Sequence, residues 1–325
     1  MNYENEIFNI KNQNDFEKLA IKIFNYQAKN NKVYSEYIKY LGVNPEKIND
    51  IKKIPFLPIE FFKTHKIITG NKSEEIIFTS SGTTGMTSSK HYVTNTELYE
   101  KSFSLAFEQF YGNIEEYCIM GLLPSYLERT GSSLIYMVDW LIKKSKHKLS
   151  SFYLHNLDDL AKNIELLQSD NQKYILFGVT YALLDFAEKF NIPLNGIVIE
   201  TGGMKGKRKE LPKEAMHQIL KDKLKLDNVH SEYGMTELLS QAYSLGNTVF
   251  QTPPWMKILI RDIYDPFAYV ENNISGGINV IDLANINSCS FIETKDLGKK
   301  FDNNTFTVLG RFDNSDIRGC NLLVQ

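Results

Sequence analysis

The first clear pattern along the chain is a set of apolar residues three and four positions apart, the spacing of one helix face. They are Phe16, Leu19, Ala20, Ile23 and Phe24. Asn14 and Glu17 have the spacing of a capping box, so we predict one helix over 14–40. A second set with the same period predicts a helix over 94–110.

Further along, short apolar runs alternate with segments of helical period. The expected order is strand 117–123, helix 132–143, strand 174–178, helix 182–190, strand 196–200 and helix 211–224. Such alternation is typical of α/β proteins with much parallel sheet. The later runs at 278–283, 290–293 and 305–309 have no helical segment between them, so we expect a separate small sheet or barrel.

Composition narrows the class of protein. A chain of 325 residues can bury the core of one large domain or two ordinary ones. The net charge of -2 gives no field that would favour nucleic acid. No apolar run approaches the roughly 20 residues of a membrane helix, and no signal peptide is apparent. Three cysteines are too few for a disulfide scaffold. We therefore expect a cytoplasmic protein with no membrane span and no nucleic-acid partner.

A loop rich in hydroxyl groups follows the short apolar run 76–78. Its residues are Thr79, Ser80, Ser81, Gly82, Thr83, Thr84 and Gly85. Glycines let backbone N–H groups approach an anion, and hydroxyls add further donors. The loop is suited to a polyphosphate, although its spacing is not that of a Walker motif. The alternative interpretation is an ordinary Ser/Thr/Gly surface turn.

Four other segments strengthen the phosphate-binding interpretation of this loop. Segment 199–206 ends a strand in a glycine-rich turn that contains Gly202, Gly203 and Lys205. Open α/β sheets bind ligands at such carboxyl edges. Segment 231–237 brings an aromatic ring, a hydroxyl and a carboxylate together, segment 293–297 has a carboxylate just after a strand, and segment 310–321 carries Arg311 and Cys320.

Together these segments resemble the adenylate-forming superfamily of acyl-CoA synthetases and related ligases. The hydroxyl loop is similar to its phosphate loop, 233–237 to its Tyr-Gly-x-Thr-Glu motif, 294–296 to its Thr-x-Asp motif, and 310–319 to its hinge. All four stand in family order. The resemblance implies the large N-terminal domain of such an enzyme over 1–310, and a truncated hinge with a cysteine-bearing tail over 311–325. The small C-terminal lobe would be missing.

The resemblance is closest to the acyl-protein synthetases of bacterial fatty acid reductase complexes, near the phenylacetate-CoA ligases. It implies ATP-dependent activation of a carboxylic acid, with a fatty acid favoured, as an acyl-adenylate. It also implies transfer to a cysteine close to the C-terminus, which is Cys320 here, and delivery to a partner similar to an acyl-CoA reductase.

The resemblance also implies roles for individual residues, with ATP and Mg²⁺ as cofactors. The hydroxyl loop would hold the β- and γ-phosphates, Thr236 the α-phosphate and Glu237 the metal ion. The adenosine would contact Gly202, Gly203, Tyr233, Gly234, Met235, Asp296 and Arg311. Lys205 would supply the positive charge of the absent lobe, although a solvated basic turn is the alternative there.

Several alternatives stay open at this level. Glu237 could be an exposed acid at a helix N-terminus. Cys118 and Cys289 lie in apolar runs and are expected to be inert core residues, whereas Cys320 could be a tail residue without function. The polar segment 124–133 either borders an acyl pocket or caps the next helix. His91 and His230 flank motifs and are interpreted as packing or polar-surface residues.

Two rival functions also remain. One is a ligase that uses free coenzyme A as acceptor, and the other is a catalytically silent subunit that binds an adenylate or an acyl group. The second is disfavoured by the intact motif residues, because a silent binder does not need the metal carboxylate.

Overall fold

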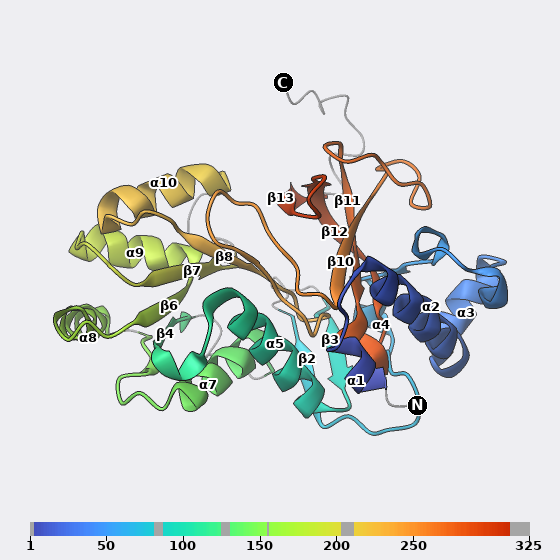
Figure 1. Ribbon diagram of the computed structural model, residues 1–325, viewed down its shortest axis with the longest axis horizontal. Helices are drawn as coiled ribbons and strands as arrows, with labels where there is room; N and C mark the ends of the chain where they lie inside the picture. The colour runs from blue at the N-terminus through green and yellow to red at the C-terminus, as the bar shows by residue number, and fades with distance from the viewer. Residues whose placement is uncertain (1–2, 81–86, 125–130, 155, 203–210, 313–325) are drawn as a thin grey trace.

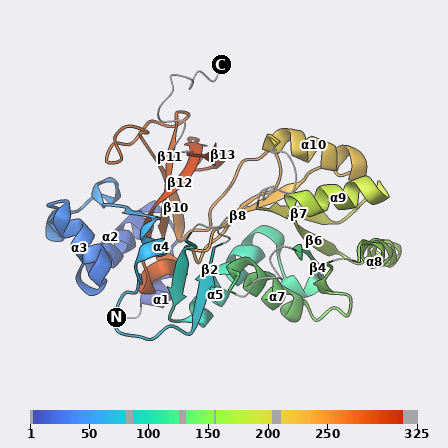
Figure 2. The same ribbon diagram turned by 180° about the vertical axis from the view of Figure 1, so that it is seen from behind.

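The computed structural model describes residues 3–80, 87–124, 131–154, 156–202 and 211–312. Two sheets of different character lie side by side, with the N-terminal helices packed on the outer side of one of them (Figure 1). A two-stranded hairpin of β2 (Ile76–Thr79) and β3 (Lys90–Val93) lies between them (Figure 2).

The larger sheet has six strands in the order β5-β4-β6-β7-β8-β9. They are β5 (Ser151–Phe152), β4 (Cys118–Leu122), β6 (Tyr174–Val179), β7 (Ile197–Thr201), β8 (His230–Tyr233) and β9 (Ala242–Ser244). All pairs are parallel except β8–β9. Every residue of β4 and β6 is buried, as expected for parallel strands covered on both faces.

Helices cover both faces of this sheet, with α9 and α10 on one side and α5 and α7 on the other (Figure 1). They are α5 (Thr96–Tyr111), α7 (Ser133–Ser145), α8 (Leu157–Ser169), α9 (Thr180–Phe190) and α10 (Lys213–Leu224). The expected α/β architecture is confirmed. Ser132 caps α7 by accepting a hydrogen bond from the Ile135 N–H. Of the two interpretations of segment 124–133, the helix cap is therefore correct for Ser132.

The second sheet is mainly antiparallel. It contains the three strands expected late in the chain, which are β11 (Ser275–Asp282), β12 (Phe291–Lys300) and β13 (Phe306–Arg311), together with β10 (Met256–Arg261), which was not predicted. This sheet is distinct from the larger sheet, as expected, and it also includes β1 (Leu57–Pro58), which pairs in parallel with β12. The expected strand 290–293 is also too short. Asp296 therefore lies within β12 and not after a strand.

The single helix predicted over 14–40 is wrong. The chain forms α1 (Tyr3–Ile7), α2 (Gln13–Asn30) and α3 (Lys32–Tyr40). Asn31 has extended backbone angles, φ -106° and ψ 108°, and its side chain caps α3 at the Tyr34 N–H. The cap of α2 is Asn12 and not Asn14. A buried asparagine thus divides what periodicity alone reads as one helix.

Shorter elements complete the fold. They are α4 (Phe61–Thr64), η1 (Pro45–Lys47), η2 (Ile51–Lys53), η3 (Ile114–Glu116) and η4 (Leu283–Asn287). None of the helices in the described ranges has the length and apolar content to cross a membrane. Cys118 and Cys289 are buried free thiols, and burial raises their pKa values to about 11 and about 12. Both fit the expected core role.

Candidate active site

The β2–β3 hairpin supports the hydroxyl loop. Thr79 pairs with Lys90 in the hairpin register, and the Thr79 N–H donates to the Gly131 carbonyl at 2.7 Å. The Ser80 N–H donates to the Ser89 carbonyl at 3.0 Å, and the Ser89 N–H donates to Ser80 Oγ at 2.8 Å. The base of the loop is therefore closed by reciprocal hydrogen bonds. Ser81, Gly82, Thr83, Thr84 and Gly85 lie outside the described residues.

The turn after β8, residues 234–240, carries the predicted Thr236 and Glu237. It is held from the second sheet, where one Asp282 oxygen accepts from the N–H groups of Leu239 at 2.8 Å and Ser240 at 2.9 Å. A Cβ at Gly234, at the start of the turn, would collide with a carboxylate oxygen of the buried Glu232, so any larger residue there would displace that side chain. Buried acceptors therefore define the path of this turn.

Glu237 is not the exposed helix-terminal acid of the alternative interpretation, since it lies in the turn with 5% of its surface exposed. Burial raises the pKa of its carboxyl, although the Ser89 hydroxyl donates to it. Within the described ranges, no basic side chain forms an ion pair with Glu237. A buried carboxylate is costly without a cation, and this one lies against Ser89 at the base of the hydroxyl loop.

These residues fit a magnesium ion better than a zinc ion. The described part of the chain contains no group of three or more His, Cys, Asp or Glu side chains placed to share a metal. Mg²⁺ usually binds through one or two carboxylates, with substrate phosphates and water completing its shell. A single buried carboxylate that contacts Ser89 is suited to that mode.

A hydrogen-bonded chain joins three predicted site residues from three strands. The Tyr233 hydroxyl on β8 donates to Asp296 Oδ2 on β12 at 2.8 Å, and Arg311 Nε at the end of β13 donates to Asp296 Oδ1 at 3.1 Å. The Tyr233 ring also packs edge-on against Phe306, with centroids 5.6 Å apart. The Asp296 carboxylate in turn raises the pKa of Arg311. Both oxygens of the buried Asp296 therefore have a donor.

The glycine-rich turn after β7 is described only as far as Gly202. That residue has φ +70°, a conformation that favours glycine. Its carbonyl accepts from Thr180 Oγ1 at 2.5 Å. Gly203 and Lys205 lie outside the described residues, as does Cys320. Gly202 thus directly follows β7, as expected, and Tyr233 is the last residue of the neighbouring strand β8, at the same carboxyl edge of the larger sheet.

Sequence reasoning missed a buried ionic cluster beside this turn. Glu200, on β7, is 2% exposed, with Lys213 Nζ at 2.5 Å and His217 Nε2 at 3.6 Å from its Oε1. Burial alone would raise the Glu200 pKa, but Lys213 and His217 outweigh it and hold the pKa at about 2. The only signal was the charge of Glu200 at the end of an otherwise apolar strand.

A second buried glutamate lies on the neighbouring strand. Glu232 accepts a hydrogen bond from Thr201 Oγ1 at 2.5 Å. Burial and the charge of Glu200 raise its pKa to about 7, although Thr201 opposes this. Glu232 lies within the motif segment 231–237, but no function was predicted for it from the sequence. The fold therefore tolerates an acid that holds its proton well above the usual glutamate range.

Replacing Glu232 by Gln should stabilise the protein at pH 8 by about 1–3 kcal/mol and change little at pH 5. The folded state retains a proton that the unfolded state releases, so the stability of the wild type falls as pH rises toward about 7. Urea unfolding at both pH values measures this. Exposed Glu165→Gln is the matched control and should show no such pH-dependent gain. An equal effect of Glu232→Gln at both pH values would contradict the buried acid.

Solved structures similar to this chain are adenylate-forming enzymes. MatB from Rhodopseudomonas palustris with ATP bound has a TM-score of 0.55 and 16% identity, covering 74% of this chain and 49% of that one. A 2-hydroxyisobutyryl-CoA ligase in the postadenylation state has a TM-score of 0.67 and 9% identity, covering 92% and 68%. MenE from Bacillus subtilis, in complex with ATP and a magnesium ion, has a TM-score of 0.50 and 18% identity, covering 72% and 49%.

These identities establish the fold alone, and the chain spans about half the length of the first of these structures. No match was found among curated proteins. The family model described as "Acyl-protein synthetase, LuxE" matches residues 6–325. With the order of the motifs and the adenylate-forming fold, this match places the protein: the chain belongs to the LuxE acyl-protein synthetase family.

Proposed function

We propose that this protein is an ATP-dependent acyl-protein synthetase that activates a carboxylic acid and transfers the acyl group to its own Cys320. The observation that carries the proposal is the buried Glu237 carboxylate, which forms no direct ion pair within the described ranges and contacts Ser89 below the hydroxyl loop. A carboxylate in this position suits a metal ion that accompanies the phosphates of ATP.

In the first step, a carboxylate oxygen of the acid attacks the α-phosphorus of ATP. The bond from that phosphorus to the bridging oxygen breaks, and pyrophosphate leaves with the electron pair. The protein mainly has to position the groups and neutralise charge. The loop 79–85 would hold the β- and γ-phosphates and Thr236 the α-phosphate. Mg²⁺ held by Glu237 would neutralise charge on the phosphate oxygens.

The adenosine would lie at the carboxyl edge of the larger sheet. Its proposed contacts are Gly202, Gly203, Tyr233, Gly234, Met235, Asp296 and Arg311. The hydrogen-bonded chain from Tyr233 through Asp296 to Arg311 supports this, because it gives a buried carboxylate a fixed orientation for ribose hydroxyls. Lys205, in the glycine turn, would add positive charge.

In the second step, the Cys320 thiolate attacks the carbonyl carbon of the acyl-adenylate. A thioester bond forms, and AMP leaves with the oxygen of the broken C–O bond. In this proposal, 1–310 is the adenylating domain and 311–325 a hinge with the cysteine-bearing tail. A fatty acid is the proposed substrate, and a protein similar to an acyl-CoA reductase would collect the acyl group.

ATP–pyrophosphate exchange with a panel of carboxylic acids tests the first step. Exchange should depend on the acid and on Mg²⁺, and should proceed without coenzyme A, because adenylation precedes thiol transfer. Fatty acids of increasing length, aryl acids and short acids should be compared at equal concentration. Absence of exchange with every acid would favour a silent binding subunit. Turnover that requires free coenzyme A as acceptor would favour a CoA ligase.

A further inference from the structure

His91 connects the hairpin below the hydroxyl loop to the turn that carries Thr236 and Glu237. It lies on β3, opposite Phe78 of β2, and is 1% exposed. Its Nδ1 lies 2.9 Å from the carbonyl oxygen of Thr236, 145 residues further along the chain. From the sequence, this histidine was interpreted as a packing or polar-surface residue.

The contact with Thr236 defines which nitrogen of His91 carries the proton. A carbonyl oxygen can only accept, so Nδ1 must be the donor. Burial lowers the pKa of His91 to about 4, and the ring is therefore neutral at pH 7. Its Nε2 is left as an acceptor. That atom is buried and has no hydrogen-bond partner among the described residues.

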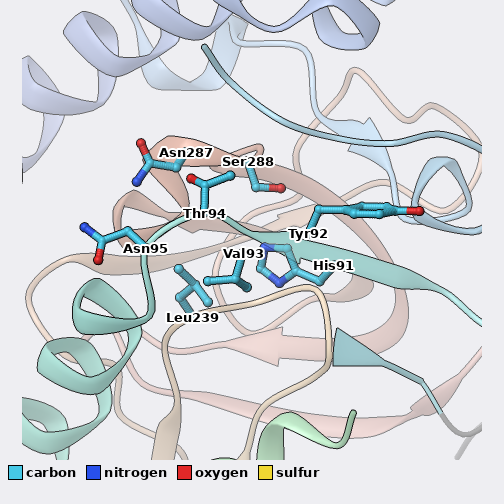
Figure 3. A pocket seen from close by; sticks show the side chains of 8 residues that line it. All are labelled: His91, Tyr92, Val93, Thr94, Asn95, Leu239, Asn287 and Ser288. Atoms are coloured by element: carbon cyan, nitrogen blue, oxygen red, sulfur yellow. The ribbon is translucent and has the colours of Figure 1, made fainter. Parts of the chain in front are cut away.

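A small cavity lies beside the ring (Figure 3), with a volume of about 10 Å³. His91, Thr94, Leu239 and Asn287 are among its lining residues, and the lining is almost wholly apolar. A buried water needs several polar partners, so this cavity is not suited to one. The described hydrogen bond of the ring is therefore the one from Nδ1.

The short helix η4, which contains Asn287, also binds the next carbonyl of the turn, that of Glu237. Asn285 Nδ2, on η4, donates to the Glu237 carbonyl at 2.7 Å. The carbonyl of Asn285 accepts in turn from Gln27 Nε2 of α2 at 3.0 Å. Consecutive carbonyls at 236 and 237 therefore have donors from the hairpin and from η4. The positions of the Thr236 and Glu237 side chains, which are the proposed phosphate and metal contacts, depend on this stretch of backbone.

We propose that His91 is a positioning residue for adenylation: its Nδ1–H donates to the Thr236 carbonyl and so ties the hairpin to the turn that carries Thr236 and Glu237. The hairpin and the turn then keep one relative position. The hydroxyl loop and Glu237 would therefore contact the phosphates of the same ATP molecule. This inference rests on the proposed adenylation, because it assigns His91 no contact with substrate.

Two substitutions separate the two ring nitrogens. In His91→Asn the amide N–H₂ can replace the Nδ1 donor, whereas in His91→Gln the longer amide reaches the Nε2 position and the donor to Thr236 is lost. We expect His91→Gln to lower kcat for ATP–pyrophosphate exchange about tenfold or more with little change in the KM for ATP, and His91→Asn to retain kcat within about threefold. Exposed His65→Gln is the control and should match the wild type.

Structural readouts accompany the kinetics. ¹⁵N NMR of the histidine rings should identify His91 as neutral and protonated at Nδ1. Protonation at Nε2 would overturn the proposal.

The outcomes are distinct from those that test the function itself. If the wild type catalyses exchange and His91→Gln equals it, the positioning role is wrong and the proposed function stands. If both His91 variants lose kcat in proportion to lost unfolding free energy, His91 is only structural. If the wild type catalyses no exchange with any acid, both proposals fall.

Discussion

Replacing Glu237 by Gln should reduce Mg²⁺-dependent ATP–pyrophosphate exchange at least about a hundredfold. The amide keeps the shape of the side chain but removes the charge that would hold the metal ion. Because burial raises the Glu237 pKa, a proton competes with Mg²⁺ at higher pH than for an exposed glutamate. The apparent affinity of the wild type for Mg²⁺ should therefore weaken as the pH falls, already above the ordinary titration range of glutamate.

The control for this prediction is stability. Above its pKa, Glu237 places a charge in the interior without a direct ion pair among the described residues, so Glu237→Gln should unfold at the same or a higher urea concentration than the wild type. Exposed Glu108→Gln on α5 should leave exchange unchanged. A folded Glu237→Gln protein with wild-type exchange would rule out the proposed metal ligand.

Replacing Cys320 by Ser should abolish stable acylation of the protein while ATP–pyrophosphate exchange continues. The thiolate is the nucleophile, and its tether makes attack on the acyl-adenylate effectively intramolecular. Incubation with ATP, Mg²⁺ and labelled acid should place a hydroxylamine-labile label on the C-terminal peptide of the wild type. Peptide mapping after hydroxylamine treatment measures this.

The other two cysteines provide an internal control. Cys118 and Cys289 are buried, and pKa values of about 11 and about 12 leave almost no thiolate at pH 7. Neither should carry label, and Cys118→Ala should acylate as the wild type does. Label that persists in Cys320→Ser, or maps to a buried cysteine, would contradict the proposed acceptor and return the CoA-ligase alternative to first place.

The larger sheet was readable from the sequence because its central strands are buried on both faces. β4 and β6 appear as short apolar runs between helical segments. The second sheet was harder. β12 has Lys and Asp in its alternating pattern and continues for ten residues, whereas its apolar run suggested only the first few. The pairing of β1 with β12 left no local signal, because it joins segments distant in the chain.

Some features of the candidate site were likewise predicted from the sequence, and others were missed. Motif spacing selected Tyr233, Asp296 and Arg311, which the structure joins by hydrogen bonds. It did not reveal the ion pair of Glu200 with Lys213 or the bond from His91 to Thr236. Those contacts depend on how separate elements approach each other, and no spacing rule within one segment encodes that.

The junction between the N-terminal helices and the second sheet has implications for biosynthesis. Gln27 contacts residues 258 to 263 positions further along the chain, and β1 pairs with β12. A nascent chain that has completed α2 and α3 cannot bury their apolar faces against this sheet until most of the protein has been translated. Long-range closure of this kind is slow and leaves apolar surface exposed. Synthesis of this protein should therefore depend on chaperones until residues near 292 have emerged from the ribosome.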